Sequence, residues 1–195
     1  MPLTCFIYLE NDAKKICNNL STMWKYRHFT RKNYDDSCGG NTMEAVQEVV
    51  RDYNVEVIDL LNHKISPYDY EHKNKDDDFI RIAEKLVETD IIVFATPVYW
   101  YSMSSQLKIF FDRLSDLLNI RKDIGRALKG KICYLVASGT DKELPDGFEV
   151  PFRDTCKHFG MRYKEAFYFF VKKEGVMSEN VRNSASKFGA KIFSS

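Results

Sequence analysis

Residues 91–118 constrain the fold of this chain most strongly, because they join a buried strand to an amphipathic helix through a proline-containing loop. Residues 91–95 are wholly apolar and rich in β-branched side chains, which is typical of a strand covered on both faces. Pro97 ends this strand, since proline has no N–H to donate to a central ladder. From Met103 onward, apolar residues recur at helical spacing. They are Leu107, Phe110, Phe111, Leu114, Leu117 and Leu118.

The loop between this strand and this helix contains three aromatic residues, Tyr99, Trp100 and Tyr101. In open α/β sheets, ligands bind in the crevice at the carboxyl ends of the strands. Val98 and the three rings would then form one wall of a pocket for a flat ligand. The alternative is that the rings pack against neighbouring loops, and the composition of the loop does not decide between the two.

Strand-like and helix-like segments alternate along the rest of the chain, which predicts a parallel sheet with helices on both faces. We expect one flavodoxin-like domain over residues 1–195, an α/β three-layer sandwich with a five-stranded parallel sheet of order 2-1-3-4-5. Residues 10–38 have no clear period and are predicted to be an atypical insertion or irregular segment. The predicted strands cover residues 2–9, 55–61, 91–95, 130–137 and 161–171. The predicted helices begin near residues 42, 76, 103, 150 and 178. Residues 119–129 are predicted to be a basic linker.

Two further loops fall at the same predicted edge of the sheet. Residues 39–40 are a glycine pair before a helix that Asn41 or Thr42 can cap. Such a pair lets backbone N–H groups approach an anion, which the helix dipole favours, although an ordinary loop and cap is the simpler explanation. Residues 138–140 (Ser-Gly-Thr) follow the fourth strand, where they form either a plain turn or a place for backbone amides to meet a ligand.

The overall composition argues against several classes of function. Lys plus Arg number 29 and Asp plus Glu number 28, so the net charge of +1 does not favour binding to nucleic acid or to an anionic membrane. No apolar run reaches the roughly 20 residues of a membrane span, and the N-terminal residues are a poor secretory signal, so we expect a cytoplasmic protein. The five cysteines include no C-x-x-C pair, and the three aspartates at residues 76–78 are predicted to begin a helix, so no metal site is expected.

Residues 96–103, with the sequence TPVYWYSM, resemble a strand–loop–helix motif of the NAD(P)H-dependent FMN reductase family of flavodoxin-like flavoproteins. The resemblance continues into the helix at residues 106–108 (QLK) and 111–113 (FDR). It also includes Asp59 and Leu60, the ISPY segment at residues 65–68 and the AFYFF run of the last strand. It covers the chain from Gly39 to the C-terminus.

This resemblance implies an FMN-dependent oxidoreductase that uses NAD(P)H to reduce a quinone, a flavin or a similar small acceptor. The flavin would supply the chemistry, so no catalytic side chain and no metal are implied. Family members assemble as homodimers or homotetramers, and the resemblance implies the same for this chain. The implied FMN-binding residues are Gly40, Asn41 and Thr42 at the phosphate, Pro97, Val98, Tyr99 and Trp100 on one side of the ring, and Ser138 and Gly139 on the other.

The first loop departs from the family pattern. The family carries Ser-x-Arg-x-x-Gly-Asn-Thr almost directly after its first strand, whereas only Gly40, Asn41 and Thr42 match here. Asp35 and Ser37 stand at the expected Ser and Arg positions, and about thirty residues separate the first strand from Gly40. The alternative is therefore that this chain is a non-catalytic relative of the family that has lost tight FMN binding. An electron-transfer flavodoxin is disfavoured, because such proteins are usually strongly acidic.

Overall fold

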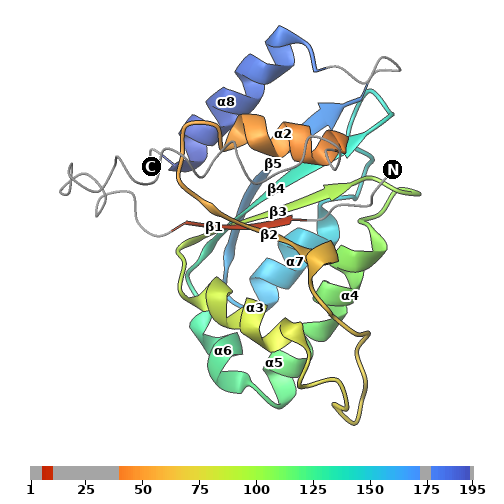
Figure 1. Ribbon diagram of the computed structural model, residues 1–195, viewed down its shortest axis with the longest axis vertical. Coiled ribbons are helices and arrows are strands. Elements are labelled where there is room, and N and C mark those ends of the chain that lie inside the picture. The colour runs from red at the N-terminus through yellow and green to blue at the C-terminus, as the bar shows by residue number, and fades with distance from the viewer. Residues whose placement is uncertain (1–5, 11–39, 172–176, 194–195) are drawn as a thin grey trace, which may run out of the picture.

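The computed structural model describes residues 6–10, 40–171 and 177–193, which form one five-stranded sheet with helices on both faces (Figure 1). The elements in chain order are β1 (Phe6–Glu10), α2 (Asn41–Val49), β2 (Glu56–Asp59), the 3-10 helix η3 (Leu60–Asn62), α3 (Asp78–Val87), β3 (Ile91–Pro97), α4 (Ser105–Arg113), α5 (Asp116–Asn119), α6 (Lys122–Ala127), β4 (Ile132–Gly139), α7 (Val150–His158), β5 (Arg162–Phe170) and α8 (Glu179–Phe193).

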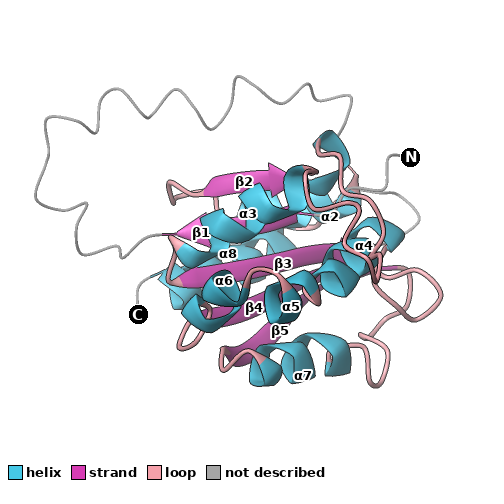
Figure 2. Cartoon of the chain, turned by 90° about the horizontal axis from the view of Figure 1, so that it is seen from below, coloured by secondary structure: helices cyan, strands magenta, loops and turns pink. Residues whose placement is uncertain are grey.

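The helices divide into two layers, with α2 and α8 on one face of the sheet and α3 to α7 on the other (Figures 1 and 2). Alternate residues of the central strands supply both interfaces. On β3, Val93 and Ala95 pack under α2 and α8, whereas Ile92 and Phe94 belong to the core on the opposite face. This double burial is why the strand is a continuous apolar run in the sequence. The α/β class and the three-layer arrangement are confirmed.

The strand order in the sheet is β2-β1-β3-β4-β5, and β3, β4 and β5 run parallel to one another. β1 is antiparallel to both of its neighbours, with Phe6 opposite Ala95 and Glu10 opposite Ile91. The prediction of an all-parallel sheet is therefore wrong at this strand. A short apolar run pairs in either direction, and about thirty residues follow β1 before Gly40, so the connection does not force a parallel strand.

Three other predicted elements differ from those observed. The helix expected from Met103 to Leu118 is divided into α4 and α5, and the predicted basic linker at residues 119–129 contains α6. The predicted strand at residues 55–61 ends at Asp59 and continues as η3. The predicted atypical insertion or irregular segment at residues 10–38 lies almost wholly outside the described residues, since only Glu10 is described.

α2 and α8 approach each other closely, which fixes α2 on the sheet. A Cβ atom on Gly189 of α8 would lie 1.9 Å from the carbonyl oxygen of Val49, so only glycine allows this contact. Arg182 of α8 forms an ion pair with Glu44 of α2 at 2.7 Å and a second with Glu48. Both interactions hold the orientation of α2, whose first turn faces the candidate site.

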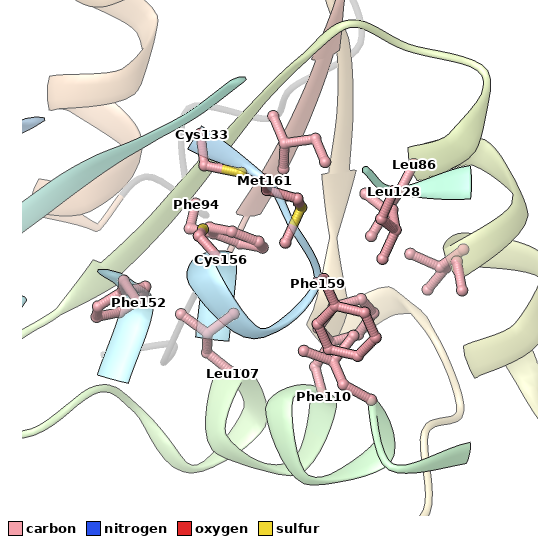
Figure 3. Close-up of a cluster of buried hydrophobic side chains, with 14 of the residues drawn as sticks. Leu86, Phe94, Leu107, Phe110, Leu128, Cys133, Phe152, Cys156, Phe159 and Met161 are labelled. Atoms are coloured by element: carbon pink, nitrogen blue, oxygen red, sulfur yellow. Dashed lines mark hydrogen bonds between the residues drawn. The ribbon is translucent and has the colours of Figure 1, made fainter. Parts of the chain in front are cut away.

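The core on the α3–α7 face contains a group of sulfur atoms beside aromatic rings (Figure 3). Cys133 of β4 and Cys156 of α7 are buried free thiols, and the Cys133 Sγ lies 3.6 Å from the Sδ of Met161. The hydrogen bond with Cys156, and then burial, raise the pKa of Cys133, so it stays a protonated thiol. Cys133 is fully buried in this core.

Candidate functional site

The carboxyl ends of β3 and β4 lie side by side and form one wall of the candidate site. Pro97 pairs with Ser138, and the N–H of Val98 donates to the Ser138 carbonyl at 2.7 Å. Farther along the chain, the N–H of Ser104 donates to the Thr96 hydroxyl at 3.0 Å, and Ser104 caps α4. These bonds fix both ends of the intervening loop against the sheet.

A two-residue hairpin turn forms the tip of this loop. Tyr99 and Ser102 exchange both backbone hydrogen bonds, at 2.9 and 3.0 Å. Trp100 and Tyr101 have φ values of 47° and 62°, as a type I′ turn requires, although this turn favours Asn and Gly. Trp100 is 94% exposed and Tyr101 is 71% exposed, so these two rings do not pack against neighbouring loops.

The first turn of α2 meets the same edge of the sheet without a side-chain cap. Gly40 is the N-cap residue in an extended conformation, and among the described residues no side chain caps the helix N–H groups there. Asn41 and Thr42 are inside the helix, so the prediction that one of them caps it is wrong. The leading N–H groups of a helix have no intrahelical partner, and they favour an anion at this place.

A buried pair of hydroxyls joins this helix start to the end of β4. Thr42 Oγ1 and Ser138 Oγ are 2.6 Å apart, and the two residues are 4% and 2% exposed. One hydroxyl donates and the other accepts, so the proton of the accepting hydroxyl has no acceptor among the described residues. A buried donor of this kind costs free energy unless something else accepts its proton.

Gly139 occupies a place that the surrounding side chains leave too small for a Cβ atom. Such an atom would lie 2.6 Å from Tyr168 Oη and 3.3 Å from the Cβ of Val98. The Tyr168 hydroxyl donates to the carbonyl of Asp141 at 2.8 Å. Sequence reasoning assigned no role to Tyr168, and its only signal was a tyrosine within the apolar run of the last strand.

Most of the predicted binding residues therefore meet at one edge of the sheet. Direct contacts join the α2 start, the β3 end and the β4 end through Thr42, Ser138 and Val98. Gly40 and Asn41 are half-buried beside this junction, and Pro97 and Gly139 are half-buried within it. Tyr99 is 43% exposed at the base of the hairpin, and Trp100 is directed into solvent and is not gathered with the others. The predicted positions that distinguish the first loop, Asp35 and Ser37, lie outside the described residues.

The described part of the chain contains no group of three or more His, Cys, Asp or Glu residues placed to hold a metal ion. Within the same residues, no helix is long and apolar enough to cross a membrane.

Comparison with known proteins gives a family match and one curated relative. The sequence model of the NADPH-dependent FMN reductase family matches residues 31–174. A protein of Bacillus subtilis strain 168, YwqN, is named as an NAD(P)H-dependent FMN-containing oxidoreductase. It is 32% identical over 136 residues, which are 65% of this chain and 75% of that protein.

Solved structures share the fold at lower sequence identity. The Trp repressor binding protein from Bacillus subtilis has a TM-score of 0.59 at 22% identity, with 76% of this chain and 92% of that chain covered. An FMN-dependent NADH-azoreductase from Bacillus anthracis strain Ames Ancestor, solved in complex with FMN, has a TM-score of 0.58 at 10% identity, with 80% and 93% covered. At these identities the likeness concerns the fold alone.

Proposed function

The chain belongs to the NADPH-dependent FMN reductase family, and on this basis we propose that it is an FMN-dependent oxidoreductase that uses NAD(P)H to reduce a quinone, a free flavin or a similar small acceptor. The observation that carries the proposal is the junction of the α2 start with the ends of β3 and β4, because it lies within the matched residues. The identity of the acceptor is part of the proposal.

The residues at the start of α2 fit a phosphate group. The uncapped N–H groups of the first turn offer donors and the positive end of the helix dipole. Gly40 leaves its backbone open to close approach. The hydroxyl proton of the Thr42–Ser138 pair that has no acceptor within the described part of the chain supplies one more donor at this place. These features support the binding of the FMN phosphate by Gly40, Asn41 and Thr42.

The ends of β3 and β4 fit the edge and one face of a flat ring. Pro97 and Val98 offer an apolar surface, and Gly139 lets backbone approach where a side chain would intrude. Tyr99 lies beside them at the base of the hairpin. When bound, FMN supplies the redox chemistry. The protein residues bind the ring, orient it and exclude water from it, and no protein acid, base or nucleophile is part of the proposal.

The alternative of a non-catalytic relative that has lost FMN is less well supported. This alternative requires that the altered first loop prevents the site from binding the FMN phosphate. Among the described residues, the first N–H groups of α2 have no side-chain cap and one buried hydroxyl proton of the Thr42–Ser138 pair has no acceptor, and both observations argue for a retained anion site. The homodimer or homotetramer and the cytoplasmic location expected from the sequence stay predictions.

The test is a visible absorption spectrum of the purified protein, before and after addition of FMN. We expect a yellow protein, or one that takes up added FMN, whose flavin absorption bleaches with NADPH or NADH under anaerobic conditions. A protein that stays colourless and takes up no FMN would contradict the proposal.

A pair of variants tests the phosphate end separately. Thr42→Val keeps the shape of the side chain but removes its hydroxyl, and we expect FMN to bind about tenfold more weakly, the usual loss for a hydrogen bond to a charged group. Ser184→Ala is the matched control, since its exposed hydroxyl on α8 bonds the carbonyl of Asn180 on the same helix. Equal affinities of the two variants would contradict a role for Thr42.

A further inference from the structure

The small size of Gly139 is explained by one atom of the neighbouring strand. Gly139 is not among the described glycines with positive φ, so it is not required for its backbone conformation. The nearest atom to an added Cβ is Tyr168 Oη at 2.6 Å, whereas the Tyr168 ring carbon Cε2 is 3.4 Å away. Contacts of 3.4 Å are ordinary van der Waals contacts. The hydroxyl, and not the ring, is therefore the main obstacle to a side chain at residue 139, and the Cβ of Val98 at 3.3 Å is a lesser one.

The same hydroxyl also fixes the chain just beyond Gly139. It donates to the Asp141 carbonyl at 2.8 Å, while the ring of Tyr168 packs against the buried core on the α7 side of the sheet, as Val98 and Leu144 do. Burial, and then the charge of Asp141, raise the pKa of Tyr168, so the hydroxyl keeps its proton at neutral pH. The loop after β4 is thus held by a donor on a strand that lies beside it.

We propose that Tyr168 is a positioning residue, whose hydroxyl clamps residues 139–141 and thereby sets how closely the end of β4 approaches the flavin ring. The proposal rests on the proposed function, because it concerns the same site. Its specific content is that Tyr168 acts through one hydroxyl oxygen, which both occupies the space beside Gly139 and bonds Asp141.

The experiment is a double-mutant cycle with Gly139→Ala, Tyr168→Phe and the variant that carries both. Gly139→Ala forces the loop away from Tyr168, and we expect a lower melting temperature and at least tenfold weaker FMN binding. Tyr168→Phe removes the bond to Asp141, and we expect a few-fold weaker affinity and a shifted reduction potential of bound FMN. In the double variant the added methyl meets no hydroxyl, so most of the loss caused by Gly139→Ala should be recovered.

Tyr163→Phe is the matched control on the same strand. The Tyr163 hydroxyl bonds the Glu149 carboxylate at 2.5 Å, near the opposite end of β5. This variant should change the melting temperature while leaving FMN affinity and the reduction potential unchanged. If it alters both flavin properties as Tyr168→Phe does, the effect belongs to the strand in general and the proposal is wrong.

The outcomes separate this proposal from the proposed function. If the wild-type protein binds FMN, but Tyr168→Phe changes neither affinity nor potential, only the positioning role is overturned. Additive losses in the double variant would likewise overturn the steric role of the hydroxyl. If neither the wild-type protein nor any variant binds FMN, the proposed function is wrong, and the positioning role of Tyr168 is wrong with it. The melting temperatures of the variants still measure the contact between residues 139 and 168 in that case.

Discussion

Arg113 is a buried cation that ties the loop before α3 to α4 and α5. The residue is 1% exposed, and its Nε donates to Asp116 at 2.7 Å. Its Nη1 donates to Asp77 at 2.5 Å and to the carbonyl of Ser66 at 2.9 Å, and its Nη2 donates to the carbonyl of Asn74 at 3.0 Å. Burial lowers the pKa of Arg113, but the hydrogen bonds to both carboxylates outweigh it and raise the pKa overall.

Replacement of this residue by an apolar one should destabilise the fold strongly. Arg113→Met removes the guanidinium that pairs with the carboxylates of Asp77 and Asp116, which are 5% and 2% exposed, and leaves Asp116 with its hydrogen bond to His72 at 2.8 Å. Breaking a buried ion pair on one side costs about 3–5 kcal/mol, so we expect the free energy of unfolding to fall by about that amount. Urea unfolding followed by circular dichroism measures it.

Arg121→Met provides the comparison. Arg121 also bonds two carboxylates, and its bonds to Asp123 and then Glu84 raise its pKa, but its partners are 66% and 48% exposed. Water screens such surface pairs, so we expect a loss below about 1 kcal/mol. Similar losses for the two variants would show that burial does not decide the strength of these ion pairs.

The sequence does not reveal this role for residue 113. It predicts that the three aspartates at residues 76–78 begin a helix, and Asp77 does cap α3 by accepting from the N–H of Phe79 at 3.0 Å. Arg113, the cationic partner of Asp77, is 36 residues away, and local patterns carry no information about it. The helix start was predictable from charge and dipole, whereas the buried ion pairs depend on how α4 packs on the loop.

At the scale of elements, the hairpin at residues 99–102 combines exposure with an unfavourable backbone. Trp100 and Tyr101 both have positive φ, which costs about 1–2 kcal/mol for a residue with a side chain of this kind. Packing of the two rings does not offset this free-energy cost, since both rings are largely exposed. A turn of this type with Asn and Gly at its centre would form more easily.

Trp100→Asn/Tyr101→Gly should therefore stabilise the protein. We expect the free energy of unfolding to rise by about 1–2 kcal/mol, because the new residues tolerate positive φ. Thermal unfolding followed by circular dichroism measures the change. If the exposed rings contact the flavin or the acceptor, as the sequence predicts for Trp100, the same variant should lose activity while it gains stability.

Trp100→Ala/Tyr101→Ala separates the two effects. It removes both rings but keeps residues that resist positive φ, so its stability should stay close to that of the wild type. Its activity should fall as far as that of the Asn-Gly variant. Equal stability of the two double variants would contradict the assignment of strain to this turn.

The boundaries of α5 and α6 show where sequence patterns fail for short elements. A Cβ on Gly125 would lie 2.5 Å from the carbonyl oxygen of Leu117, so α6 packs tightly on α5 through a glycine. Local propensity disfavours a helix with glycine at its centre, and charged residues dominate this segment. By contrast, β3 and α3 were predictable from the sequence. The continuous apolar run of β3 indicates burial on both faces, and the apolar stripe of α3 at helical spacing indicates burial on one face.

At the scale of the whole molecule, the direction of β1 is the main feature that the sequence left undetermined. β3, β4 and β5 are parallel because helices connect them on the outside of the sheet. α2 also lies between β1 and β2 in the chain, but about thirty residues separate β1 from Gly40, so this connection does not fix the direction of β1. Its last residue, Glu10, pairs with Ile91 at the beginning of β3, whereas Thr42 contacts Ser138 at the end of β4. β1 therefore ends far from the candidate site, unlike the first strand that the family pattern implies.

Disulfide trapping tests the direction of β1. In the antiparallel register Phe6 pairs with Ala95, so Phe6→Cys/Ala95→Cys in a Cys5→Ser background should cross-link on oxidation, because residues directly opposite have Cβ atoms about 5 Å apart. Glu10→Cys/Ala95→Cys should not, because Glu10 pairs with Ile91, about 13 Å along β3. Peptide mapping by mass spectrometry detects either cross-link. If the second pair forms and the first does not, β1 is parallel and delivers the chain toward the phosphate end of the site.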